Sequence, residues 1–106
     1  MGHKSRPGPQ QTYLVEHYRP DRDVAQLNAS IVRVREAISE MKRAGTAVRC
    51  VMSMIVPKDE SFLCLIEAAS ESVVANAYGH ADVQFERISP AICVEDQVKR
   101  SKETDS

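Results

Sequence analysis

The sequence predicts a single domain of the α+β class whose elements follow the order βαββαβ. Its 106 residues, 42% of them hydrophobic, suit one small domain with its own core. Two observations predict the order: apolar residues recur every three or four positions from Val24 to Met41, and at every second position after Gly45. A four-stranded antiparallel sheet with two helices on one face satisfies this order, which is the ferredoxin-like arrangement.

The first two elements are predicted to be a strand and a long helix. The run Tyr13 to Tyr18 is rich in aromatic and β-branched residues and stops at Arg19-Pro20, which is typical of a strand followed by a turn. We expect Asp21 or Asp23 to cap the helix and Gly45 to follow its end. The apolar stripe of the helix consists of Val24, Leu27, Ile31, Val34, Ile38 and Met41.

A β-hairpin is predicted next. The strand Val48 to Val56 alternates, "PKDE" forms the turn, and "SFLCLIEAA" returns as the second strand. Met52 and Met54 are expected to face a helix in the core. A tight turn would offset Cys50 from Cys64 by three or four residues, on the order of 10 Å at about 3.3 Å per residue. A disulfide needs α-carbons roughly 6 Å apart, so both cysteines are expected to be small buried hydrophobes.

The chain then predicts a short helix and a last strand. Ser70 or Ser72 caps the helix and Gly79 is expected to close it. The final strand is "VQFERISPAICVE". Pro90 lies within it and cannot donate to a neighbouring strand, so this strand is expected at an edge of the sheet.

Composition bounds the organisation and location of the chain. We expect a folded body over residues 11–95 between disordered tails over 1–10 and 96–106, which contain little apolar material. A net charge of -1 gives no basic field for nucleic acid, and no apolar run is long enough to span a membrane. The N-terminus lacks the apolar core of a signal peptide, and three cysteines without a C-x-x-C pair suit a reducing compartment. These features predict a cytoplasmic protein.

The apolar pattern of the second hairpin strand indicates that the sheet packs against a second copy of the chain. Phe62, Cys64 and Ile66 would lie on one face, and Leu63 and Leu65 on the other. Two helices cover only one face of the sheet, so the second apolar face would be exposed on a monomer. We therefore expect a homodimer formed through the open sheet face.

Several stretches together resemble a known family. They are "YLVEHYRP", the helix ending at Gly45, "VPKDESFLCLIEAAS", "VVANAYG" and "FERI", which cover the body from Tyr13 to Ile92. They resemble a family of small bacterial ferredoxin-like proteins, a domain of unknown function that includes a nickel-binding, dimeric Streptomyces member. The resemblance implies a dimer that binds a divalent metal ion, with nickel as the expected ion. The chain departs from the family pattern at His17, where a basic residue is typical, and at Gly79 to Asp82, which replaces Gly-Leu-Pro-Phe.

The metal hypothesis has four candidate ligands. His17 is a lone histidine on a strand, and His80-Ala81-Asp82 with Glu86 offers imidazole and carboxylate on a predicted exposed loop, which suits a borderline divalent ion. Glu16 and Glu67 are further possible ligands. The alternatives are a hydrogen-bonded structural histidine for His17 and a solvated turn for the loop. Such a protein would sequester a metal ion or respond to it.

A second hypothesis is a small-molecule-binding protein or small enzyme that uses a carboxylate in a cleft of the sheet or dimer. Its candidate residues are Glu16, Tyr18, Arg49 and Glu67, with two nearby carboxylates sharing a proton or acting as acid and base. The alternative is that each acid pairs with Arg49, Arg87 or water. A third hypothesis is an interaction module without chemistry. Base-stacking aromatics, a glycine-rich phosphate loop and a nucleophile elbow are all missing from the sequence.

Overall fold

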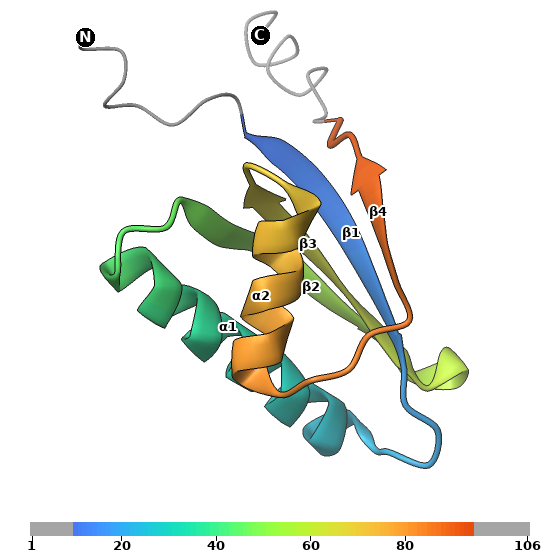
Figure 1. Ribbon diagram of the computed structural model, residues 1–106. Helices are drawn as coiled ribbons and strands as arrows, with labels where there is room; N and C mark the ends of the chain where they lie inside the picture. Colours follow the sequence, from blue (N-terminus) through green and yellow to red (C-terminus); the bar gives the residue numbers. More distant parts are fainter. Residues whose placement is uncertain (1–9, 95–106) are drawn as a thin grey trace, which may run out of the picture.

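The computed structural model describes residues 10–94, so most of the two predicted tails lies outside it. Six main elements follow one another along the chain: β1 (Gln11–Tyr18), α1 (Val24–Arg43), β2 (Val48–Val56), β3 (Ser61–Ala68), α2 (Glu71–Ala81) and β4 (Arg87–Ala91). The strands form one antiparallel sheet in the order β2-β3-β1-β4, and both helices lie on the same face of it (Figure 1). The prediction of a ferredoxin-like α+β fold is confirmed. Neither helix is long and apolar enough to cross a membrane.

Helix α1 begins at a capping box. Asp23 accepts a hydrogen bond from the backbone nitrogen of Gln26 at 2.8 Å, and the Gln26 side chain accepts one from the backbone of Asp23 at 2.9 Å. These two bonds satisfy donors that the helix itself leaves free. The predicted stripe is buried from Leu27 to Met41, whereas Val24 in the first turn is exposed.

Replacing the cap tests this account of the helix start. We expect Asp23→Ala to lower the free energy of unfolding by about 1 kcal/mol, because a backbone donor loses its partner. Urea denaturation measures the change, with Arg22→Ala, at the exposed neighbouring position, as the control. Equal decreases in the free energy of unfolding in the two variants would contradict a capping role for Asp23.

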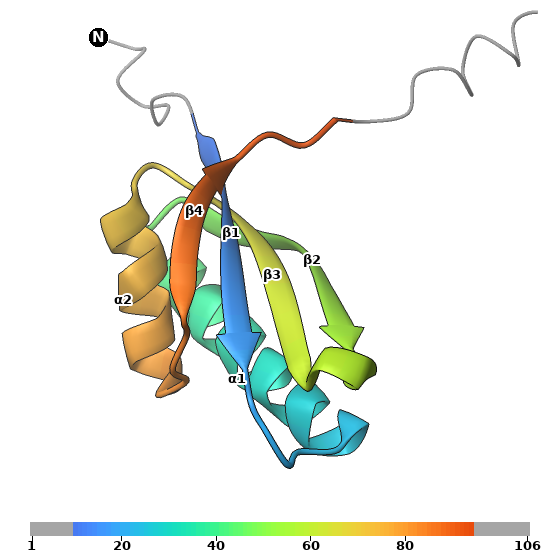
Figure 2. The same ribbon diagram turned by 90° about the vertical axis from the view of Figure 1, so that its right-hand side faces the viewer.

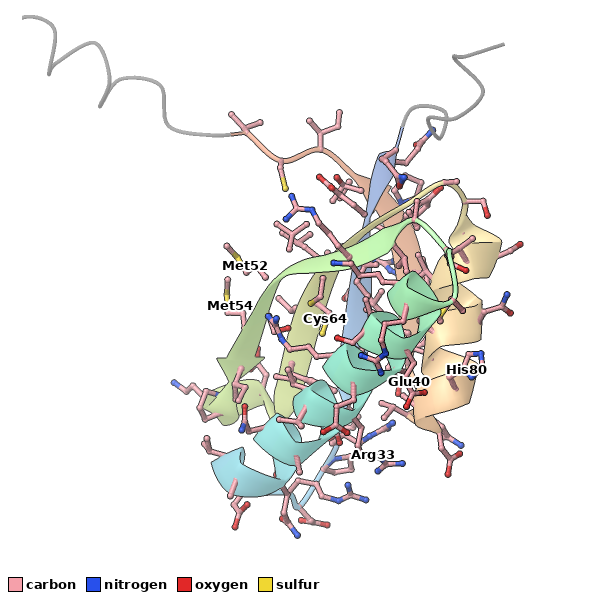
Figure 3. The ribbon with its side chains drawn as sticks, turned by 90° about the vertical axis from the view of Figure 1, so that its left-hand side faces the viewer. Arg33, Glu40, Met52, Met54, Cys64 and His80 are labelled. Atoms are coloured by element: carbon pink, nitrogen blue, oxygen red, sulfur yellow. The ribbon has the colours of Figure 1, made fainter. Side chains whose placement is uncertain are left out.

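Strand β2 contains a bulge that reverses its faces. Cys50 lies opposite Ile66 and Met52 opposite Leu65, so Val51 is an extra residue in the ladder. A bulge of one residue sends the following side chains to the other face. Met52 and Met54 are therefore 45% and 51% exposed, and Figure 3 shows them on the side of β2 that points away from α1. The expectation that they face a helix in the core was wrong.

The C-terminal elements differ from the sequence prediction in their ends. Ser70 caps α2 as expected, but the helix continues past Gly79 to Ala81 and ends at Asp82, whose φ of 57° is left-handed. The last strand is shorter than predicted, because only Arg87–Ala91 pairs with β1. Its place at the sheet edge, which accommodates Pro90, is confirmed.

The core lies between the sheet and the two helices. Figure 2 shows the helices behind the sheet and no helix on its other face. Strand residues of the core alternate with half-buried residues that point to the open side, which makes a two-layer α/β sandwich. The buried cluster includes Val15, Phe62, Cys64 and Ile66 from the strands and Ile31, Val34, Ile38, Val74, Ala77 and Tyr78 from the helices.

Candidate functional site

Glu16 and His17 point to opposite faces of β1, as their adjacency predicts. Glu16 is half-buried on the open face, where the guanidinium of Arg87 lies 3.0 Å from its carboxylate. Glu67, on the same face of β3, accepts a hydrogen bond from Arg49 at 2.9 Å. Pairing with arginine, one of the alternatives drawn from the sequence, is confirmed for both acids.

The two carboxylates do not share a site. Glu16 lies opposite Leu63, four residues along β3 from Glu67, which corresponds to about 13 Å at roughly 3.3 Å per residue. Tyr18 lies beyond Glu16 at the far end of β1, and it is exposed. The residues of the predicted carboxylate cleft are therefore divided between two ends of the open face, and each acid is held by an arginine.

The four expected metal ligands lie apart. His17 is buried, whereas His80 is exposed on the last turn of α2, on the outer side of the helix in Figure 3. Asp82 lies 3.9 Å from Arg33, which also donates to the carbonyls of Ala81 and Asp82. Glu86 lies 4.0 Å from Arg19. Among residues 10–94, no group of three or more His, Cys, Asp or Glu side chains could hold a metal ion, so the described residues of one chain do not fit a metal centre.

His17 is the polar residue that the fold buries most completely at this site, with 1% of its surface exposed. Its ring stacks on Phe62 at a centroid distance of 3.8 Å, and its Nδ1 lies 2.9 Å from the Phe62 carbonyl oxygen. A carbonyl oxygen only accepts, so Nδ1 carries the hydrogen. The neutral ring then presents Nε2 as an acceptor, and no hydrogen-bond partner reaches this atom among the described residues.

The core keeps this imidazole uncharged. Burial lowers the pKa of His17 from 6.5 to about 4; the hydrogen bond to Phe62 opposes that shift, and the charge of Arg19 adds to it. At neutral pH the side chain is therefore a fixed base with a free lone pair. A lone pair of this kind accepts a hydrogen bond from a hydroxyl or an N–H group.

Tyr78 brings a second unpaired polar atom to the same place. It comes from α2, and its ring centroid lies 5.2 Å from that of His17. Within residues 10–94 its buried hydroxyl has no hydrogen bond of ordinary geometry, although the Cys64 side chain lies close enough to influence its pKa. Burial raises the pKa of Tyr78, so the hydroxyl stays protonated and can donate. Buried polar atoms are normally paired, so two neighbouring exceptions mark a candidate binding site.

A hollow of about 380 Å³ adjoins Tyr78. It opens between the end of α2 and the segment that leads to β4, and Phe85 of that segment meets the Tyr78 ring edge-on at 5.4 Å. Its lining residues are Ala75, Tyr78, Gly79, Asp82, Val83, Gln84 and Phe85. Tyr78 thus belongs both to the hollow and to the buried pair with His17.

Sequence reasoning did not single out Tyr78. One observation was available: Tyr78 lies on the buried face of α2 with Val74, Ala77 and Ala81, where its hydroxyl is the one polar group of the stripe. A hydroxyl on such a stripe indicates a core polar contact, but its neighbour His17 comes from a strand 61 positions earlier. The pair therefore appears only once β1 and α2 face each other.

No protein-family model matches the chain, and the comparisons with curated proteins and with solved structures return no match.

Proposed function

We propose that the protein is a homodimer that binds a small, largely apolar molecule bearing a hydroxyl group. The observation that carries the proposal is the pair of unpaired buried atoms, His17 Nε2 and Tyr78 Oη. We propose that one ligand hydroxyl donates to Nε2 and accepts from Oη, since the two rings are neighbours and a hydroxyl can do both. Satisfying a buried polar group recovers a penalty of about 1–3 kcal/mol, which gives selectivity for a hydroxylated ligand.

The hollow beside Tyr78 supports the size and polarity of this ligand. Its volume of about 380 Å³ can hold the body of a small molecule, but the hollow is shallow and open to solvent, so it would enclose such a molecule only in part. Ala75, Val83 and Phe85 supply apolar surface for the body of the ligand. The segment that carries Phe85 is held by a hydrogen bond from Glu86 to the Glu16 carbonyl at 2.8 Å. We propose that rotation of the Phe85 side chain, rather than movement of the whole segment, admits the hydroxyl to the Tyr78–His17 pair.

The open face of the sheet supports the homodimer. Leu14, Leu63 and Leu65 form its half-buried centre, and Met52 and Met54 extend it along β2. The Glu16–Arg87 and Glu67–Arg49 pairs lie toward opposite ends of this face. A surface that carries both charges at each end suits contact with its own copy about a two-fold axis.

Hydroxylated probes test the ligand site. Phenol and cyclohexanol are titrated calorimetrically at pH 7 beside benzene and cyclohexane, which have the same frames without the hydroxyl. We expect the hydroxylated probes to bind about tenfold or more tightly than their partners, because only they pair with His17 and Tyr78. Equal affinity within each pair of probes would contradict the proposal.

Two tyrosine variants locate the contact. We expect Tyr78→Phe to remove most of the preference for phenol over benzene, whereas Tyr18→Phe, at an exposed tyrosine, retains it. Without ligand, Tyr78→Phe should be neutral or slightly stabilising, since it deletes a buried hydroxyl that makes no hydrogen bond of ordinary geometry among residues 10–94. A phenol preference that survives in Tyr78→Phe would place the ligand elsewhere.

Divalent-metal binding, which the family resemblance implies, is a second proposal with one observation in its favour. His17 donates from Nδ1 to a backbone carbonyl and leaves Nε2 free, as metal-ligating histidines commonly do. Further ligands would have to come from outside residues 10–94, because His17 lies on the helix-covered face and a second copy on the open face would not reach it. Calorimetry with nickel, cobalt and zinc on tag-free, metal-stripped protein, beside a His17→Ala/His80→Ala double variant, tests it. Micromolar binding that the variant loses would support it, and millimolar or absent binding would contradict it.

A further inference from the structure

The bulge in β2 gathers two thiols around one hydroxyl. Ser53 Oγ lies 3.6 Å from the Cys50 sulfur and 3.3 Å from the Cys64 sulfur. Cys64 lies opposite Ser53, three residues from Cys50 along β2, as the sequence predicts, but Cys50 lies opposite Ile66, only two residues from Cys64 along β3. The expected separation on the order of 10 Å was wrong, because the extra residue Val51 had not been foreseen.

We propose that Cys50 and Cys64 form a peroxide-reactive pair that closes to a disulfide, with Cys50 as the sulfur that is oxidised first. The two differ in access: Cys50 is half-buried on the edge strand β2, whereas Cys64 is buried on the neighbouring strand β3. An oxidant reaches Cys50 first, and Cys64 then attacks from the core side. The chemistry does not require the proposed ligand, although Cys64 lies close enough to the Tyr78 hydroxyl for each side chain to influence the pKa of the other.

The surroundings of the two sulfurs shift the pKa of Cys50 and the pKa of Cys64 in opposite directions. Hydrogen bonds from Cys64 and Ser53 and the charge of Arg35 on α1 lower the pKa of Cys50, and burial opposes them. The neighbouring Cys50 sulfur and burial raise the pKa of Cys64. The pair therefore favours one thiolate, on Cys50, beside one protonated thiol, and the thiolate is the reactive form.

The chemistry needs one two-electron oxidant, a hydroperoxide. The Cys50 thiolate attacks one oxygen of hydrogen peroxide, the O–O bond breaks, and hydroxide leaves to give a sulfenic acid. Cys64 then attacks the Cys50 sulfur, the S–O bond breaks, and water leaves with the proton of Cys64. The net reaction turns two thiols and one hydrogen peroxide into one disulfide and two waters.

Formation of the Cys50–Cys64 disulfide requires a small movement of the backbone. Diagonal residues on neighbouring antiparallel strands lie roughly 7–8 Å apart, and a disulfide needs α-carbons within about 6.8 Å. Strand β2 is bonded to a neighbour on one side only, and its ladder is already interrupted beside Cys50. The edge strand can therefore move toward β3 while the central strands stay in place.

The test oxidises the full chain carrying Cys93→Ser, which leaves two cysteines. One equivalent of hydrogen peroxide at pH 7 should lower the intact mass by two hydrogen atoms and protect both thiols from iodoacetamide, and dithiothreitol should reverse both changes. With Cys64→Ser added, Cys50 should gain one oxygen and react with dimedone. With Cys50→Ser added instead, Cys64 should be oxidised at least tenfold more slowly than Cys50 is in the chain that carries Cys64→Ser.

A wild-type measurement keeps the test decisive if a serine variant fails to fold. Differential alkylation and peptide mapping of the oxidised wild-type chain should locate the Cys50–Cys64 bridge and leave exposed Cys93 alkylated. Oxidation of Cys50 no faster than that of Cys93, or oxygen gain at Cys50 without a bridge while Cys64 is present, would overturn the proposal.

Discussion

Lowering the pH from 7 to 5 should remove about 2 kcal/mol of stability through His17 alone. The pKa of this residue is about 4 in the folded protein and 6.5 when unperturbed, so the unfolded chain binds one more proton between these values. Stability therefore rises with pH across this window: the His17 contribution is fully present above pH 6.5 and is lost as the pH falls toward 4. At about 1.4 kcal/mol per pKa unit, the complete loss amounts to about 3 kcal/mol.

Urea denaturation at pH 7, 6 and 5 measures this effect as a difference between variants. We expect the loss between pH 7 and 5 to be smaller by about 2 kcal/mol in His17→Gln than in wild type, because the side chain no longer titrates. His80→Gln, at an exposed histidine, is the matched control and should follow wild type. Equal acid losses in wild type and His17→Gln would show that His17 is not buried as a neutral base.

We expect a single charge on the open sheet face to convert the proposed dimer into monomers. Strands β1, β2 and β3 have eight, nine and eight residues and β4 has five, so the sheet is roughly 19 Å wide and its longer strands are roughly 26 Å long. Side-chain relief raises the accessible area of this face toward the approximately 800 Å² per partner of a stable interface. Met52 lies on this face opposite Leu65. In Met52→Glu the two-fold axis places two uncompensated carboxylates in the interface, so we expect the dissociation constant to rise at least about 100-fold.

Analytical ultracentrifugation measures the result. Wild type should sediment as twice the chain mass of 11.8 kDa at micromolar concentration, and Met52→Glu as a monomer. Val32→Glu is the control, because Val32 on α1 is 43% exposed, close to the 45% of Met52, but lies on the helix side of the molecule. A monomeric wild type, or equal dissociation of both variants, would contradict dimerisation through the sheet.

The fold was predictable because local patterns agree with the tertiary structure. Short stretches of sequence are enough to predict three features: the apolar stripe of α1, the Asp23 cap and the edge position of the strand that contains Pro90. The bulge at Val51 is not, because an extra residue in a ladder depends on the partner strand. The prediction that α2 ends at Gly79 was wrong for a related reason. Asp82 adopts the αL conformation that ends the helix, so no glycine is needed there.

The site was predictable only in part. Alternation along β1 separates Glu16 from His17, and the sequence alone supports that statement. The register of β1 against β3 decides that Glu16 and Glu67 lie apart, and two arginines from β4 and β2 decide that they are paired. The meeting of His17 with Tyr78 depends on how α2 crosses the sheet, which no spacing in the sequence encodes.

The most direct test of the account is the ¹⁵N resonance of His17 Nε2. The chain contains three histidines, so ¹⁵N-histidine labelling gives few signals and His17→Gln assigns the relevant one. At pH 7 we expect a neutral ring with hydrogen on Nδ1, whose Nε2 signal shifts saturably as phenol is added and does not respond to benzene. A hydrogen on Nε2, or an Nε2 signal unchanged by phenol, would contradict the proposed binding site.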